Sequence, residues 1–204
     1  MPNVKKDLQE EPFINIPLPK LYLYLLLVSL SILFIVFSIA YVSTRHMNSS
    51  NGVYLPPIFV TNTFILILSS WAMNKANKSY LQDNTSSYQF FLWFTLFLTF
   101  LFLMLQILGW TLYFNAMIGH NIGIGKQYLY AISGLHFAHV LGGIPFLIQF
   151  LYVAHYRMKE PVSVLVYFSD PAKKLRLEML TTYWHFLDYL WIFLVVFFLL
   201  NMFI

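Results

Sequence analysis

Long apolar stretches alternate with short polar stretches along this chain of 204 residues, and the apolar stretches predict its architecture. One helix needs about 20 apolar residues to cross a bilayer core about 30 Å thick. Five windows of this length are nearly free of charged residues. These runs are too long for the strands of a membrane barrel, which would also alternate in polarity. We predict an all-α, polytopic membrane protein, a bundle of five helices at residues 21–44, 56–74, 89–114, 127–154 and 178–204.

The composition agrees with a membrane protein and excludes several kinds of chemistry. Hydrophobic residues make up 59% of the chain and charged residues 10%, against about 25% charged residues in soluble domains. The chain has no cysteine, which excludes disulfides, cysteine-ligated zinc, iron–sulfur clusters and thiolate nucleophiles. The net charge of +4 comes from basic residues placed between apolar segments, so we expect no nucleic-acid partner.

The first twenty residues differ in character from the rest of the chain. Residues 1–20 are polar and contain four of the nine prolines. They lack a short apolar region followed by a small-residue cleavage site, so we expect no removable signal peptide. Residues 21–204 show no internal repeat, and we predict a single transmembrane domain there behind a polar N-terminal tail.

Basic residues are distributed unevenly between the two ends of the predicted helices. Ten of the twelve Lys and Arg residues fall in three segments on one side of a five-helix bundle, and only Arg45 and Lys126 fall on the other. Cytoplasmic segments are enriched in Lys and Arg, so we predict the N-terminus inside and the C-terminus outside. The ten residues are Lys5, Lys6, Lys20, Lys75, Lys78, Arg157, Lys159, Lys173, Lys174 and Arg176.

Two histidines lie in the fourth predicted helix. His136 and His139 are three residues apart and so share one face of the helix. The small residues around them, which let membrane helices approach closely, are Gly134, Ala138, Gly142 and Gly143. One interpretation is a metal or haem site. The interpretation we favour is a pair of histidines that are hydrogen-bonded within a tight contact between helices.

Polar residues form a stripe along the fifth predicted helix. Glu178, Thr181, His185 and Asp188 follow one another at spacings of three and four residues, so they lie on one side of the helix. Such a stripe must face protein or water, because ionised groups facing lipid are strongly disfavoured. It serves either as a proton relay or ion site or, as we favour, as an interhelical contact. We expect its partners on the fourth helix.

The remaining histidines and amides suggest no ligand set. At 1.5 Å per residue, the depths of His139 and His185 differ by about 12 Å, so a shared haem is not expected. His46, His120 and His155 lie in or near predicted loops and are expected to be solvated. Asn62 and Gln106 are isolated in apolar surroundings, where each can hydrogen-bond across a helix interface. Ser69 and Ser70 are interpreted as small packing residues.

Each of the five predicted helices contains a recognisable sequence motif. The two longest are S-G-L-H-F-A-H-V-L-G-G at residues 133–143 and Y-W-H-F-L-D at residues 183–188. Shorter motifs are S-I-A-Y-V-S-T-R at residues 38–45, N-T followed by L-I-L-S-S at residues 62–70, and a lone Gln106. Together they resemble the helices of subunit III of the haem-copper terminal oxidases, in the five-helix bacterial form, and cover nearly all of residues 20–204.

This resemblance implies a non-catalytic subunit of a complex such as cytochrome c oxidase, which reduces oxygen to water in aerobic respiration. Its implied role is to stabilise the catalytic subunit I, beside subunit II, and to support proton uptake. Haem and copper would lie in the partner subunit, so we expect no catalytic, cofactor-binding or metal-binding residue in this chain. Phospholipid and a respiratory supercomplex are further candidate partners. The implied location is the bacterial inner membrane.

Under this interpretation, five polar side chains form a structural intramembrane set, namely His136, His139, Glu178, His185 and Asp188. The chain departs from the family pattern at two positions. Gly109 stands where the family has the glutamate of Q-x-x-E, and Leu30 stands where it has a second intramembrane glutamate. These departures argue against a proton role built on those two carboxylates.

Three alternatives remain open. The first keeps the fold and makes the chain subunit III of a quinol oxidase or an accessory subunit of a nitric-oxide reductase. The second is a small secondary transporter that uses the polar stripe as an ion site, although the chain shows neither a repeat nor paired broken helices. The third is a haem-binding electron carrier.

Overall fold

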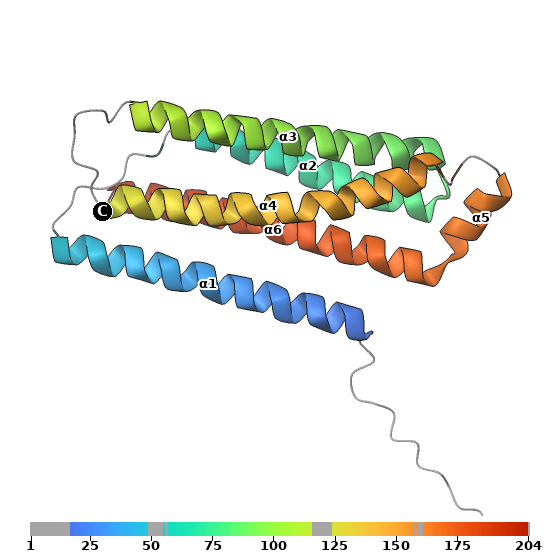
Figure 1. Ribbon diagram of the computed structural model, residues 1–204, viewed down its shortest axis with the longest axis horizontal. Helices are drawn as coiled ribbons and strands as arrows, with labels where there is room; N and C mark the ends of the chain where they lie inside the picture. The colour runs from blue at the N-terminus through green and yellow to red at the C-terminus, as the bar shows by residue number, and fades with distance from the viewer. Residues whose placement is uncertain are drawn as a thin grey trace, which may run out of the picture.

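A computed structural model of the protein describes residues 17–48, 55, 57–115, 124–156, 158 and 161–203. Within these ranges the chain is helical and contains no strand. Five long helices lie side by side, and a short helix, α5, crosses one end of the bundle (Figure 1). All five are long and apolar enough to cross a membrane, which confirms the predicted fold class. The long helices are α1 (Leu18–Asn48), α2 (Pro57–Leu81), α3 (Thr85–Asn115), α4 (Ile124–Tyr156) and α6 (Pro171–Phe203).

Part of the sequence prediction concerns residues beyond those described. The polar tail up to residue 16 and His120 lie outside the described residues, as do Lys5, Lys6, Arg157 and Lys159 of the charge argument. The side chains of Arg45 and His46 also lie outside the described part, although both residues belong to α1. The orientation of the termini across the membrane therefore stays a prediction.

The connection between α2 and α3 is much shorter than the predicted polar loop at residues 75–88. Helix α2 continues to Leu81 and α3 begins at Thr85, so only residues 82–84 form the turn. Asp83 adopts a left-handed conformation with φ of 54°, as is common just after a helix. The Asn84 side chain then caps α3 by accepting a hydrogen bond of 3.0 Å from the Ser87 N–H. Charged residues ended the predicted apolar window, but they did not end the helix.

The predicted basic loop at residues 155–177 also contains helical structure. It holds α5 (Pro161–Ser169) and the first turns of α6, which begins at Pro171 rather than at residue 178. Proline is favoured at the first position of a helix because its missing N–H has no helical partner there. The Asp170 carboxylate caps α6 by accepting a hydrogen bond of 2.8 Å from the Ala172 N–H. Ring contacts of Tyr80 with Tyr167 and Phe168 hold α5 against the end of α2.

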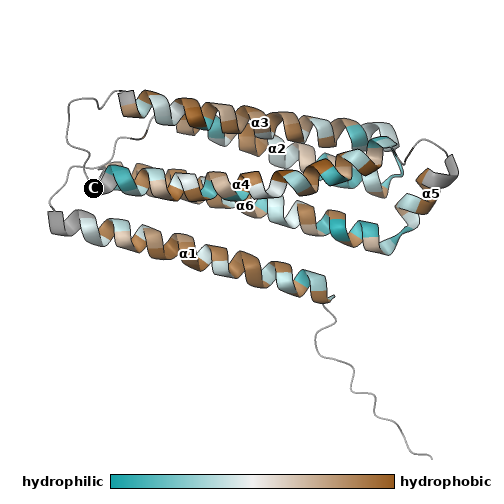
Figure 2. Cartoon of the chain, viewed as in Figure 1, coloured by the Kyte–Doolittle hydropathy of each residue, from teal (hydrophilic) through white to brown (hydrophobic). Residues whose placement is uncertain are grey.

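The five long helices contribute unequally to the core. Helices α2 and α3 make the most extensive contact, and α6 packs on both α2 and α4. Helix α1 lies at the edge of the bundle, where it contacts α4 and α6 (Figure 1). Apolar residues run along the long helices, and polar residues gather near the α5 end of α2, α3 and α6 (Figure 2). Aromatic residues such as Phe59, Phe102 and Trp191 fill the centre.

Candidate functional site

The two histidines of α4 lie in different surroundings. His136 is fully buried, and its ring contacts Phe102 and Trp191 at centroid distances of 5.9 and 5.0 Å. His139 is half-buried and faces α1, with its ring 6.1 Å from that of Phe34. Residues three apart on a helix differ by about 60° in direction, since each residue turns it by about 100°. This difference is enough to give the two histidines separate neighbours.

Of the three glycines near these histidines, only Gly143 lies in a tight contact. A Cβ atom at Gly143 would lie 3.0 Å from the Tyr183 ring and 3.2 Å from the Trp184 ring. A Cβ atom at Gly134 or Gly142 would meet nothing within 4 Å. Among these glycines, the predicted close approach of α4 to another helix therefore occurs at Gly143, where α6 packs against it.

The polar stripe of α6 divides between two neighbouring helices. Near the start of α6, Glu178 forms an ion pair of 2.8 Å with Lys20 of α1. Both side chains are partly exposed, at 28% for Lys20 and 34% for Glu178. The Thr181 hydroxyl donates to the backbone carbonyl of Leu177 within its own helix. The first half of the stripe thus holds α1 against α6.

The second half of the stripe faces α2. His185 lies 2.7 Å from the Ser70 hydroxyl through Nδ1 and 2.9 Å from the Asn74 amide oxygen through Nε2. If Nε2 donates to the Asn74 oxygen, Nδ1 of the neutral ring accepts a hydrogen bond from the Ser70 hydroxyl. The neighbouring Trp184 indole donates to the Ser69 hydroxyl at 3.1 Å. The prediction that the partners lie on the fourth helix is wrong, because the rotation of α6 turns these residues toward α2.

Asp188 lies deeper along the same face. It is buried, and its Oδ2 atom is 4.0 Å from His185 Nδ1. Ser70 also lies beside the Asp188 carboxyl group. The structure therefore brings His185 and Asp188 together at the contact with α2. Glu178 and His139 both face α1, whereas His136 lies in the core beside Trp191, one helical turn from Asp188.

Three residues of this contact were not identified from the sequence. Ser69 and Ser70 were interpreted as packing residues, but both hydrogen-bond to α6. Asn74 was not singled out. Its spacing of four residues from Ser70 places both on one face of α2, which is a signal that sequence inspection can detect.

The two isolated amides behave as predicted. The Asn62 side-chain amide donates to the Gln106 side-chain oxygen at 2.9 Å, and both residues are fully buried. This bond joins α2 to α3 and confirms that each amide hydrogen-bonds across a helix interface.

The described histidines and carboxylates do not converge on a ligand. Within the described ranges, no group of three or more His, Asp or Glu side chains is placed to hold a metal ion. His139 faces α1, whereas His185 faces α2. The arrangement of these groups fits contacts between helices.

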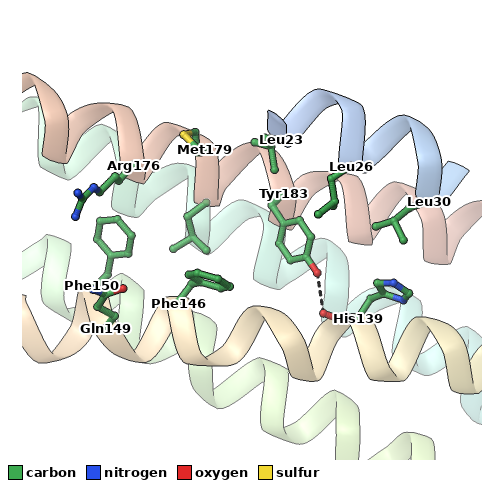
Figure 3. Close-up of a pocket in the computed structure, with 11 residues that line it drawn as sticks. Leu23, Leu26, Leu30, His139, Phe146, Gln149, Phe150, Arg176, Met179 and Tyr183 are labelled. Carbon is green, nitrogen blue, oxygen red and sulfur yellow. Dashed lines mark hydrogen bonds between the residues drawn. The ribbon is translucent and has the colours of Figure 1, made fainter. Parts of the chain in front are cut away.

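A cavity of about 520 Å³ lies between α1, α4 and α6 (Figure 3). Its walls are largely apolar and include Leu26 and Phe146. Arg176 and Gln149 lie toward one end and His139 toward the other (Figure 3). The cavity suits a flexible apolar molecule with a polar end.

The two positions where the resemblance expects glutamates differ in the space they offer. Leu30 lines the cavity, so a longer polar side chain has room there. Gly109 is buried, and a Cβ atom at this position would lie 2.6 Å from Ile58 Cγ2 of α2. The close approach of α2 and α3 therefore excludes a glutamate at residue 109 without movement of Ile58.

Comparison with known proteins identifies relatives along most of the chain. The family model described as cytochrome c oxidase subunit III matches residues 19–201. A probable cytochrome c oxidase subunit 3 from Rickettsia prowazekii is 30% identical over 155 residues, which cover 72% of this chain and 52% of the relative. Subunit 3 of the cytochrome bo(3) ubiquinol oxidase of Buchnera aphidicola is 25% identical, covering 72% of this chain and 70% of the relative. The chain spans about half the length of the Rickettsia relatives that it matches.

Proposed function

The chain belongs to the cytochrome c oxidase subunit III family, and from this premise we propose that it is the non-catalytic subunit III of a haem-copper terminal oxidase. The observation that carries the proposal is the family match over residues 19–201, which covers the five spans except for the outermost residues Leu18 and Met202. The proposed role is to stabilise the catalytic subunit and to support its proton uptake during aerobic respiration. Subunits I and II are the proposed partners.

The contacts of the polar side chains support a structural role, with no catalytic step carried out by this chain. Glu178 and His185 are engaged by α1 and α2, and Asn62 is engaged by α3. We propose that haem and copper reside in the catalytic partner and that this chain binds no redox cofactor. An absorbance spectrum of the purified chain tests this point. A stoichiometric haem band that disappears in a His139→Ala variant would contradict it.

We further propose that the cavity between α1, α4 and α6 holds an acyl chain of a phospholipid. Apolar walls suit the chain, and the Arg176 side chain at one end suits an anionic headgroup. Mass spectrometry of lipids retained after purification tests the proposal. An Arg176→Gln variant should retain less anionic lipid than the unmodified chain.

The proposed location is the bacterial inner membrane, with the N-terminus in the cytoplasm. The motivation is the excess of Lys and Arg on one side. Since the chain has no cysteine, single cysteines report topology directly. In intact spheroplasts a Lys174→Cys variant should resist an impermeant thiol reagent, and a Lys126→Cys variant should react. The reverse pattern would invert the orientation.

A second candidate keeps the role but changes the electron donor. The ubiquinol oxidase relative is matched over 70% of its length, a larger share than in the Rickettsia relatives. A quinol oxidase is therefore the alternative complex. Oxygen consumption by the purified complex with reduced cytochrome c or with a quinol separates the two.

The main test is purification of the tagged chain from its native membranes. The expected result is co-purification of a haem-copper catalytic subunit with a second subunit. Removal of the chain should lower the yield of intact complex and the oxygen turnover per haem. Purification with no haem-containing partner would contradict the proposal.

A further inference from the structure

Five buried polar side chains from four helices lie near the centre of the bundle, within about one helical turn of the same level. Asn62, Gln106 and His136 are fully buried, and Trp191 and Asp188 are 1% and 4% exposed. Each has at least one polar atom that lacks a hydrogen-bond partner within the described part of the chain. The atoms are Asn62 Oδ1, Gln106 Nε2, both ring nitrogens of His136, Trp191 Nε1 and Asp188 Oδ2. We propose that this centre binds ordered water molecules, which join α2, α3, α4 and α6.

Aromatic contacts place four of these groups, all except Asp188, at one level of the bundle. Phe59 of α2 stacks on Trp191 at 5.5 Å, and Phe102 of α3 contacts the same indole at 5.1 Å. Asn62 follows Phe59 by one turn, and Gln106 follows Phe102 by one turn. These offsets along the helix axis are about 4.5 and 6 Å.

Helices α2 and α3 run in opposite directions, because a turn of residues 82–84 joins them. The hydrogen bond between Asn62 and Gln106 therefore lies between the levels of Phe59 and Phe102. That is the level of the Trp191 ring, which touches both phenylalanines. His136 reaches the same level, with its ring 5.0 Å from the indole.

The donor or acceptor character of the unpaired atoms indicates which ligand this centre can bind. Trp191 Nε1 and Gln106 Nε2 can only donate hydrogen bonds, whereas Asn62 Oδ1 can only accept them. The neutral His136 ring offers one donor and one acceptor. A cation is disfavoured by the donors, and an anion is disfavoured by the acceptors and by the Asp188 carboxyl group. Water both donates and accepts, and buried water usually makes about three hydrogen bonds to such groups.

A polar route connects this centre to the surface of the bundle. Asp188 lies one turn before Trp191 on α6, and its neighbours are His185 and Ser70. His185 in turn bonds to Asn74, which is exposed. Water that crosses an apolar interior loses its hydrogen bonds, which is costly. The polar contact between α2 and α6 is therefore the favoured path for water to enter. The inference stands independently of the proposed function.

The test uses the full chain in nanodiscs with its five tryptophans labelled with ¹⁵N. Magnetisation transfer from water to each indole N–H is measured, and a Trp191→Phe variant assigns the signal. Trp110 and Trp184 are internal controls, because each donates to a serine at 3.1 Å. A water signal at Trp191, absent at the two controls, is expected. Its absence at Trp191 would overturn the proposal.

A His136→Phe substitution provides a second readout whose sign decides the outcome. In a hydrated centre, phenylalanine displaces water and leaves Gln106 and Trp191 unpaired, so the midpoint of thermal unfolding falls by several degrees. In a dry centre, the same change removes two unpaired nitrogens, so the midpoint rises. His139→Phe is the matched control and should leave the Trp191 water signal unchanged. A higher midpoint for His136→Phe would reject the hydrated centre, and the measurement on the unmodified chain stands even if this variant does not fold.

Discussion

Helix α6 makes two different kinds of contact, one with α2 and one with α1. Toward α2 its polar groups are hydrogen-bonded in largely buried positions, as in the bond of 3.1 Å from Trp184 to Ser69. Toward α1 it offers the partly exposed ion pair with Lys20 and a cavity of about 520 Å³. The α2 side is a packed interior, whereas the α1 side is an edge.

The difference shows why the apolar character of a helix does not predict a central position in a membrane bundle. Helix α1 is the most apolar of the five spans, yet its apolar window is the least buried. Lipid is as apolar as leucine, so a purely apolar helix gains little from moving to the centre. Residues such as Asn62, Ser69 and Gln106 instead mark the buried faces.

The largest effect is expected from placing glutamate at the two family positions. Gly109→Glu should destabilise the chain by about 4 kcal/mol, because it combines overpacking against Ile58 with a buried carboxyl group. Leu30→Glu should be tolerated much better, since Leu30 lines the cavity. Thermal unfolding of both variants measures the difference. Adding Ile58→Ala to Gly109→Glu should recover part of the loss, and equal stability of the two glutamate variants would remove the contrast.

A smaller effect is expected from a substitution that creates a cavity in the packed interior. Phe102 is fully buried against His136 and Trp191, whereas Phe100 on the same helix is 49% exposed. Phe102→Ala should cost about 3 kcal/mol, at the low end of the usual range because lipid also solvates apolar groups. Phe100→Ala is the matched control and should change the unfolding midpoint little. A larger loss for Phe100→Ala would mean that a partner covers that face.

The sequence predicts the spans of this bundle better than their ends or rotations. Windows nearly free of charged residues located all five spans, but α2 extends past Lys75 and Lys78 toward the aqueous boundary. Long basic side chains extend to water from the last turns of a helix, so a charged residue does not end a helix there. The true ends depend on local caps such as Asn84 and Asp170.

The candidate site was predictable as a set of polar residues but not as a set of contacts. The spacing of Glu178, His185 and Asp188 placed them on one side of a helix, and this side does face protein at His185 and Asp188. Their partners depend on how α6 is rotated against its neighbours, which its own sequence does not fix. The bond between Asn62 and Gln106 was easier to anticipate, because an isolated amide in an apolar span requires a partner.

The polar contact between α6 and α2 should tolerate loss of charge better than loss of polarity. Asp188→Leu removes hydrogen bonding from a buried site and should cost about 2 kcal/mol. Asp188→Asn retains it and should leave stability and assembly nearly unchanged. Oxygen turnover per assembled complex measures the functional effect of the Asn variant. Normal assembly with severely reduced turnover would indicate that Asp188 handles protons directly.

The smallest effect is expected at the edge, where Lys20 and Glu178 hold α1 against α6. The side chains are 28% and 34% exposed, so water and salt screen their attraction. A double-mutant cycle with Lys20→Gln and Glu178→Gln should give a coupling of about 0.2–1 kcal/mol, as for other exposed pairs. The coupling should shrink further in high salt, and exchanging the two residues should restore most of it. A coupling as large as the effect of Asp188→Leu would mean that α1 is held as firmly as α2, and the contrast between edge and interior would then fail.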